Sequence, residues 1–198
     1  SSVRASRTSS AFRLLATTMA RHSLEYSSKT VSILNGRLID PAHGIDDHLD
    51  LHIDGQQVVA VGDAPAEFAA EEIIDAGGSV VCPGLVDLAA SLREPGYEHK
   101  ATLASETAAA ARSGITTLLC TPNTYPVIDN TAVVELIHRL ARKLGQARVL
   151  TTGALTQGLA GEQLSEMAAL KAVGCVAVSN AHRPLASTLV ERRALEYA

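Results

Sequence analysis

The sequence contains no tryptophan and few other aromatic residues, with four Tyr and two Phe among 198 residues. It also lacks a run of about 18 apolar residues, which argues against a membrane-spanning helix. Basic residues are not in excess, because 17 Lys and Arg stand against 21 Asp and Glu, for a formal net charge of -4. No basic stripe is therefore available for nucleic acid. With 46% hydrophobic residues, the chain can bury a core.

Cysteine is scarce, and the chain has no Cys-x-x-Cys motif. The three cysteines are Cys82, Cys120 and Cys175, and each lies in an apolar run. This pattern predicts three buried, reduced thiols and favours a cytoplasmic location.

The first 24 residues differ in composition from the rest, with six Ser, four Arg and no acidic residue. Arg-rich and Ser-rich segments without acidic residues are typical of organelle transit peptides. The alternative is that residues 1–18 are non-native, since Met19 offers an ordinary start. In either case we expect residues 1–29 to form a disordered leader or a non-native extension outside the fold.

Short extended patterns fill residues 30–82 and predict a small β module. Two pairs of strands are expected, one around the turn Asn35-Gly36 and one around Asp54-Gly55. Two further short strands are expected at residues 72–75 and 79–81.

Strand and helix patterns alternate over residues 83–198, which predicts an α/β fold with a parallel sheet. Strands are expected at 85–89, 115–120, 148–152 and 175–179, and helices at 101–112, 131–144, 162–173 and from Thr188 onward. Two architectures fit: an open doubly wound sheet, or half of a (β/α)8 barrel, which takes about 250 residues in full. No Gly-x-Gly-x-x-Gly follows a strand, so dinucleotide binding has no support. In a barrel, functional residues follow the strands.

Four motifs stand in order along the chain and together resemble the dihydroorotases of the amidohydrolase superfamily. Residues 83–88 read Pro-Gly-Leu-Val-Asp-Leu and residues 92–96 read Leu-Arg-Glu-Pro-Gly. Residues 122–129 and 193–198 continue the match. The resemblance implies a β-sandwich segment over residues 30–82, followed over 83–198 by the first four βα units of a TIM-type barrel. The barrel is then incomplete, and the chain is expected to be truncated.

The resemblance fails at the metal-binding positions. Active dihydroorotases carry His-x-His directly before Leu-Arg-Glu-Pro-Gly, and both histidines bind zinc; the corresponding residues here are Ala89 and Ser91. The metal-bridging aspartate of the family corresponds to Asn180. An alanine has no donor atom, a serine hydroxyl stays protonated at neutral pH, and an asparagine brings no charge to the metal. We therefore expect no metal cofactor and no catalytic residue in this chain.

Two positions that contact substrate in the family are retained. The resemblance implies that Arg93 pairs with a substrate carboxylate and that Asn123 forms a hydrogen bond at the same end of the substrate. These two residues are candidates for vestigial binding of a small carboxylate. The alternatives are structural: Arg93 pairs with Glu94 or Asp87, and Asn123 caps a turn.

The histidines offer weaker candidates. His48, Asp50 and His52 alternate along one expected strand and so share a face, which we interpret as a solvated edge rather than a metal site. His138 is expected on the polar side of its helix. His182 follows the last strand and is interpreted as a loop histidine, since no partner for it is evident.

The leading hypothesis is a non-catalytic dihydroorotase-like protein of pyrimidine biosynthesis. The resemblance implies that such a protein associates with aspartate transcarbamoylase as a structural partner, in a hetero-oligomer. An alternative is an active zinc-dependent dihydroorotase or related cyclic amidase, which interconverts carbamoyl aspartate and dihydroorotate at a relocated metal site that uses His182. A third hypothesis is a sensor that binds the same ligands through Arg93 and Asn123 without turnover.

Overall fold

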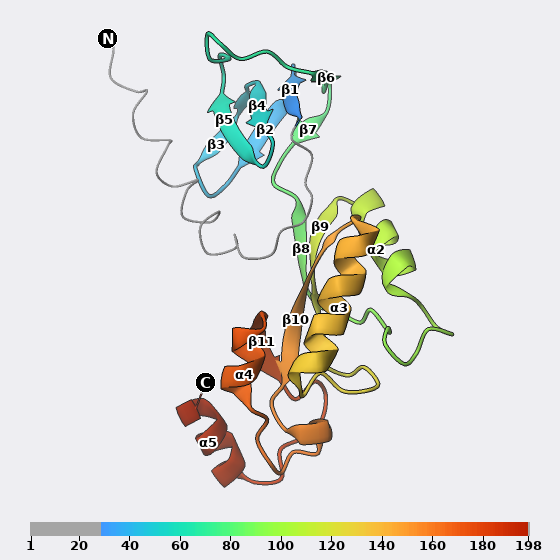
Figure 1. The fold of residues 1–198 in the computed structure, drawn as a ribbon. Helices are drawn as coiled ribbons and strands as arrows, with labels where there is room; N and C mark the ends of the chain where they lie inside the picture. Colours follow the sequence, from blue (N-terminus) through green and yellow to red (C-terminus); the bar gives the residue numbers. More distant parts are fainter. Residues whose placement is uncertain (1–28, 198) are drawn as a thin grey trace. The chain divides into compact units, whose positions relative to one another are not determined.

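The computed structural model describes residues 29–197, so residues 1–28 of the leader expected over residues 1–29 lie outside the described residues. The chain divides into two compact units, Ser1–Pro83 and Gly84–Ala198 (Figure 1). This division lies one residue from the boundary that we expected between residues 82 and 83. Within residues 29–197, no helix is long and apolar enough to cross a membrane.

The first unit contains two small sheets. One sheet has the strand order β5-β4-β1-β6 and the other has the order β3-β2-β7. The expected hairpin at Asp54-Gly55 is confirmed, because β4 and β5 pair antiparallel with Asp54 opposite Gln57. The strands are β1 (Thr30–Leu34), β2 (Arg37–Asp40), β3 (Ile45–His48), β4 (Leu51–Asp54), β5 (Gln57–Val61), β6 (Glu72–Asp75) and β7 (Val80–Val81).

The expected hairpin at Asn35-Gly36 is wrong, because β1 and β2 belong to different sheets. Asn35 has a left-handed φ of 63°, and its Nδ2 donates to Asp75 Oδ1 at 3.0 Å. A Cβ on Gly36 would lie 2.6 Å from a methyl carbon of Val81. The turn therefore leads the chain from one sheet to the other. The close approach of Val81 requires a glycine at position 36.

The expectation of a shared face for His48, Asp50 and His52 is also wrong. His48 ends β3 while His52 lies in β4, and these strands are in different sheets. His52 is only 4% exposed, on an interior strand. Its Nε2 lies 3.0 Å from the carbonyl oxygen of Gly62 and therefore donates, so Nδ1 accepts from the Ser32 hydroxyl at 2.9 Å. His52 is a satisfied core histidine.

The second unit is a parallel sheet covered by helices, with the strand order β11-β10-β9-β8. Strands that are consecutive in the chain are neighbours throughout, as in a barrel, whereas a doubly wound sheet reverses its order. The unit is therefore a partial barrel. Its strands are β8 (Leu85–Ala90), β9 (Ile115–Cys120), β10 (Arg148–Ala154) and β11 (Cys175–Ser179); its helices are α2 (Leu103–Arg112), α3 (Thr131–Leu144), α4 (Met167–Ala172), α5 (Thr188–Tyr197) and the 3-10 turn η1 (Gln157–Leu159).

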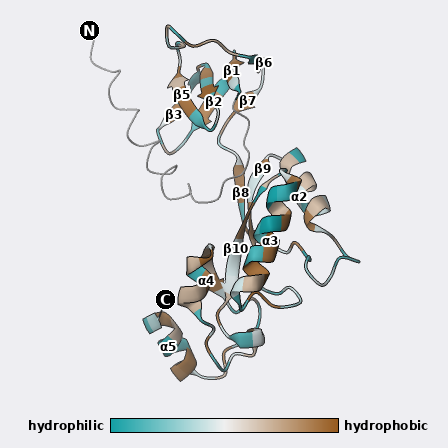
Figure 2. Cartoon of the chain, viewed as in Figure 1, coloured by the Kyte–Doolittle hydropathy of each residue, from teal (hydrophilic) through white to brown (hydrophobic). Residues whose placement is uncertain are grey.

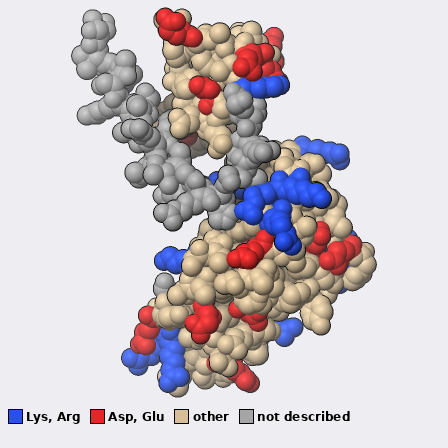
Figure 3. Space-filling view, in the orientation of Figure 1, with Lys and Arg blue, Asp and Glu red and all other residues tan. Residues whose placement is uncertain are grey.

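The core of the second unit lies between the sheet and its helices. Helix α3 has the expected bounds: Asn130 Oδ1 accepts from Val133 N at its start, and Gly145 ends it at a φ of 59°. Its buried face includes Val134 and Ile137, both fully buried, and each contributes roughly 2 kcal/mol through the hydrophobic effect. Its exposed residues include Glu135, Arg139, Arg142 and Lys143, and Figure 2 shows hydrophilic colour over its C-terminal half. Basic residues of its last turn gather at its C-terminal end (Figure 3), where they complement the helix dipole.

Two expectations about the helices are wrong. The helix expected over residues 162–173 is reduced to α4, because Ser165 N donates to Leu155 O and Leu164 pairs with Thr156. These bonds hold residues 155–165 as a loop that folds back on itself, so the helix begins only at Met167. His138 is 7% exposed rather than on the polar side of α3, and its Nε2 lies 3.2 Å from the hydroxyl of Thr151 in β10.

The two outer strands of the parallel sheet carry exposed apolar side chains. Leu88 of β8 is 73% exposed, and Leu85 and Val86 of the same strand are exposed as well. On the opposite outer strand, β11, Val176 is exposed. A closed barrel covers such strands with further strands and helices.

The expectation of three buried thiols is wrong for Cys82, which is exposed beyond the end of β7. Burial raises the pKa of the Cys120 thiol to about 12 and also raises the pKa of Cys175.

Because thiolate is the reactive form, we expect a thiol reagent such as Ellman's reagent to label one cysteine per native chain and three in denaturant. The Cys82→Ser variant should give no rapid native labelling. Rapid reaction of a second thiol would contradict the buried positions of Cys120 and Cys175.

Candidate functional site

The loops that follow the parallel strands meet at one edge of the sheet, because the strands all run in the same direction. A pocket of about 280 Å³ lies among these loops. The two retained positions, Arg93 after β8 and Asn123 after β9, both line it, together with His182 after β11. The full lining is Arg93, Tyr97, Lys100, Asn123, Leu159, Ala181, His182 and Arg183.

The β8 and β9 loops are fastened to each other beside Arg93. Tyr125 N donates to the carbonyl oxygen of Pro95 at 3.0 Å. Gly96 has a φ of 99°, and a Cβ at this position would overlap the backbone carbonyl of Tyr125. Arg93 itself has a left-handed φ of 66°, a conformation that ordinary residues rarely keep outside functional or constrained sites. The close approach of these loops brings Arg93 and Asn123 to one pocket.

The two carboxylates that the sequence offered as partners of Arg93 bind backbone amides instead. Glu94 Oε2 accepts from Leu103 N at 2.7 Å, at the start of α2. Asp87 Oδ1 accepts from Ala89 N at 2.9 Å. The ion pairs of the described residues include neither carboxylate with Arg93. The structural alternative for Arg93, a pair with Glu94 or Asp87, is therefore absent from residues 29–197.

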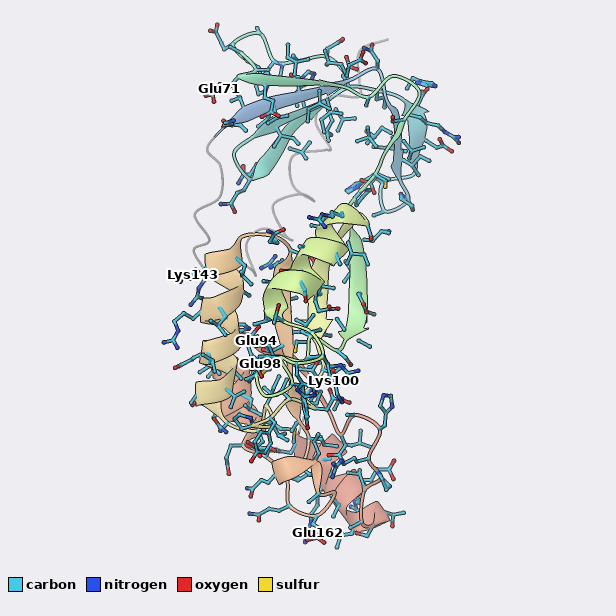
Figure 4. All side chains as sticks on the ribbon, turned by 90° about the vertical axis from the view of Figure 1, so that its right-hand side faces the viewer. Glu71, Glu94, Glu98, Lys100, Lys143 and Glu162 are labelled. Carbon is cyan, nitrogen blue, oxygen red and sulfur yellow. The ribbon has the colours of Figure 1, made fainter. Side chains whose placement is uncertain are left out.

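A third carboxylate on the same loop is also occupied. Glu98 Oε1 accepts from Gly96 N at 2.8 Å, and this bond lowers the pKa of Glu98. Figure 4 labels Glu94, Glu98 and Lys100 on this loop. Lys100 Nζ lies 5.4 Å from the ring centroid of Tyr97, within the range of a cation–π contact.

Asn123 is half-buried, and its side chain is oriented by the residue two positions before it. Its Oδ1 accepts from the Thr121 hydroxyl at 2.7 Å. That bond uses the acceptor end of the amide, so the Nδ2 hydrogens stay available as donors in the pocket.

Asn180 uses both ends of its amide to hold the loop after β11. The Thr156 hydroxyl donates to Oδ1 at 2.6 Å. Nδ2 donates to the carbonyl oxygens of Arg183, at 3.1 Å, and Pro184, at 3.5 Å. The residue is 8% exposed. The amide therefore joins the loop after β11 to Thr156, and an aspartate could not donate the same bonds.

The donor atoms at the three positions that the resemblance assigns to zinc do not suit that ion. Ala89 offers only a methyl group. Ser91 offers a hydroxyl, which lies 3.5 Å from the hydroxyl of Thr121. Asn180 offers an amide whose two ends are already bonded. Over residues 29–197, no group of three or more His, Cys, Asp or Glu side chains is placed to hold a metal ion.

Sequence reasoning missed five residues of the pocket, the apolar Leu159 and Ala181 and the polar Tyr97, Lys100 and Arg183. Tyr97 and Lys100 lie in the loop after β8, just beyond the Leu-Arg-Glu-Pro-Gly motif, and Arg183 directly follows His182. The available signal was the repeated placement of cationic residues just after strands of one parallel sheet.

Three comparisons place the chain among known proteins. The family model described as "Dihydro-orotase-like" matches residues 78–196. A Pseudomonas aeruginosa protein named "Dihydroorotase-like protein" is 53% identical over 169 residues, which are 85% of this chain and 40% of that protein. A Syntrophotalea carbinolica protein named "Dihydroorotase" is 45% identical over 168 residues, 85% of this chain and 39% of that protein.

A solved structure agrees with the fold. The L-hydantoinase (dihydropyrimidinase) of Arthrobacter aurescens matches with a TM-score of 0.58 and 25% sequence identity, over 76% of this chain and 32% of that chain. The present chain spans about 40% of the length of the curated relatives that it matches.

Proposed function

Because the chain belongs to the dihydroorotase-like family, we propose that it is a non-catalytic dihydroorotase-like protein of pyrimidine biosynthesis. The observation that carries the proposal is the bonding of Asn180, whose amide holds Thr156 and the loop carbonyls in place of a metal. Ala89 and Ser91 add no metal-binding group. In the active family, zinc lowers the pKa of its bound water from 15.7 to about 7, and nothing among Ala89, Ser91 and Asn180 replaces that function.

The proposal includes a location and a partner. We propose that the protein is cytoplasmic, that its first unit is a β-sandwich, and that it is a structural partner of aspartate transcarbamoylase in a hetero-oligomer. The partner rests on the family resemblance.

One observation favours a second candidate, an active dihydroorotase or cyclic amidase with a relocated zinc. His182 lines the same pocket as Arg93 and Asn123, so its imidazole is close to the residues that the family uses for substrate. A single histidine is not a zinc site, and this candidate needs further ligands from outside the described residues.

The native mass of the full-length protein, alone and mixed with aspartate transcarbamoylase from the same source, tests the partnership. We expect a complex of fixed stoichiometry, and we expect the Arg93→Ala variant to form it equally well, since a structural role does not need the pocket. If the two proteins keep their separate masses at micromolar concentration, the proposed partnership is wrong.

Zinc content and dihydroorotate turnover, measured on the same preparation, separate the two candidates. We expect substoichiometric zinc and no turnover above background. Stoichiometric zinc together with turnover that is lost in His182→Ala would overturn the non-catalytic proposal in favour of the relocated metal.

A further inference from the structure

Basic residues gather at the edge of the parallel sheet that lies opposite the pocket. Helices α2, α3 and α4 each end at this edge, because the strands are parallel and each helix returns to the start of the next strand. Leu85 N donates to Gly114 O at 2.9 Å, which ties the start of β8 to the end of α2. We call the basic residues of this edge the basic face: Arg112, Arg139, Arg142, Lys143, Arg148 and Lys171.

The basic face has no acidic residue to balance it. The three segments that form it, residues 107–118, 136–150 and 167–176, contain six basic residues and no Asp or Glu. The acidic residue of α3 is Glu135, one turn before Arg139, and the ion pairs of residues 29–197 include neither of them. The chain as a whole has a net charge of -4, so the sign of this face is opposite to the sign of the protein.

The basic face is open to solvent. Five of its six side chains are exposed and Arg148 is half-buried. Figure 3 shows Lys and Arg side chains gathered at the C-terminal end of α3, and Figure 4 shows Lys143 near the upper end of this helix. The same helix ends carry apolar side chains that are only partly buried, among them Leu140, Leu144 and Val173. A mixture of exposed arginines and partly buried apolar groups is typical of a protein interface.

The helix dipole accounts for only part of this arrangement. Arg112 lies in the last turn of α2, and Arg142 and Lys143 lie in the last turn of α3, where a positive charge is favourable. The effect fades within that turn, so it does not account for Arg139, and Arg148 belongs to a strand. Each helix end supplies about half a negative charge. Three helix ends therefore offset only a minor part of the six positive charges.

The composition of the face favours an acidic protein over a nucleic acid. Its three segments contain no Tyr, Phe or Trp, so bases have no aromatic side chain on which to stack. The net negative charge of the chain repels a long polyanion more than it repels a local acidic patch, because salt screens distant charges. Four of the six basic residues are arginine, which is enriched in protein interfaces and can bind a carboxylate through two parallel hydrogen bonds.

We propose that the basic face is an interaction surface for an acidic protein surface. Helix α3 packs against both α2 and α4, which places Arg139 and Arg142 at the centre of the face, with Arg112 and Lys171 at its two sides. Asp and Glu side chains of the partner pair with these groups. The inference goes beyond the proposed function, which assigns no surface of this chain to a partner, and it does not involve the pocket.

Binding of a fluorescein-labelled oligoglutamate peptide to the full-length protein, followed by fluorescence anisotropy, tests the proposal. An oligothymidylate of the same length is the probe for nucleic acid. We expect the oligoglutamate to bind at least as tightly as the oligothymidylate, and to bind more weakly as salt is added, since salt screens exposed charges. Tighter binding of the oligothymidylate would overturn the choice of a protein partner.

Paired variants assign the binding to the basic face. We expect Arg139→Gln combined with Arg142→Gln to weaken oligoglutamate binding 5-fold or more. The control is Arg192→Gln combined with Arg193→Gln, which removes the same two charges from the exposed surface of α5 and should leave binding within 2-fold. All four positions are exposed, so both variants should keep the urea midpoint of the parent protein. Equal losses in the two variants, or no binding of oligoglutamate to the parent protein, would overturn the proposal.

This assay contains no aspartate transcarbamoylase and measures neither zinc nor turnover. A failure of the inference is therefore distinct from a failure of the proposed function.

Discussion

Replacement of Asn180 by aspartate will destabilise the second unit by about 3 kcal/mol at neutral pH. The substitution keeps the size of the side chain but removes both hydrogens that Nδ2 donates to the carbonyl oxygens of Arg183 and Pro184. A buried carboxylate oxygen then faces two carbonyl oxygens. The bond from the Thr156 hydroxyl survives, because a carboxylate accepts as well as an amide does.

The loss depends on pH in a defined direction. Burial and the two carbonyl oxygens raise the pKa of the new carboxyl group in the folded state above its unfolded value. The protonated acid can donate one of the lost bonds, so that stabilisation is present below the unfolded pKa and disappears as the pH rises through the folded pKa. The loss of unfolding free energy caused by Asn180→Asp therefore grows from acid to neutral pH.

Urea denaturation of Asn180→Asp, of a control variant and of the parent protein at several pH values measures the loss of stability. The matched control is Asn123→Asp, where the same chemical change meets a donor, the Thr121 hydroxyl, rather than carbonyl oxygens. It should cost less than about 1 kcal/mol. An equal and pH-independent loss in the two variants would show that Asn180 does not fasten the loop.

The second large effect is expected for Gly96→Ala, which should destabilise the second unit by about 3 kcal/mol or more. A Cβ at this position overlaps the backbone carbonyl of Tyr125, which cannot move as a side-chain end can. The two loops must separate, and the bond from Tyr125 N to Pro95 O is lost with them. Because the same contact brings Arg93 and Asn123 to one pocket, any binding of a small carboxylate there should weaken at least 10-fold even in the fraction that folds.

Gly114→Ala is the control for this substitution. Gly114 also has a positive φ, 79°, but no atom lies within 4 Å of the place that a Cβ would take there, so the change costs only the backbone strain of about 1 kcal/mol. Urea midpoints of the two variants separate strain from overlap. Equal midpoints would contradict a specific loop contact at Gly96.

Much of the fold could be predicted because it depends on local pattern. The bounds of β9, β11 and α3 follow from apolar periodicity and from the residues that end each segment. The errors occur where distant partners decide. His138 is buried because β10 supplies the Thr151 hydroxyl for it, and the turn at Asn35-Gly36 crosses between sheets because Asp75 and Val81 lie beside it.

The site was predictable in part for the same reason. Arg93 and Asn123 stand in motifs directly after strands, and the rule that parallel strands end at one edge brings them together. Lys100 and Tyr97 reach the pocket through a folded loop whose path the sequence does not show. The bonds by which Asn180 holds its loop could not be predicted either. Its partners Thr156 and Pro184 come close to it only because the chain folds back.

The fastening by Asn180 also bears on how such a protein can change over generations. If the protein is non-catalytic as proposed, a return to metal chemistry requires an acidic residue at position 180 and metal ligands at positions 89 and 91, and no one of these changes is useful alone. The aspartate removes the bonds to Arg183 and Pro184 at once, before any ligand at the first strand can compensate. An intermediate with the aspartate alone loses stability and gains no catalysis, so selection acts against it. The bonds of the loop after β11 therefore help to preserve the altered site.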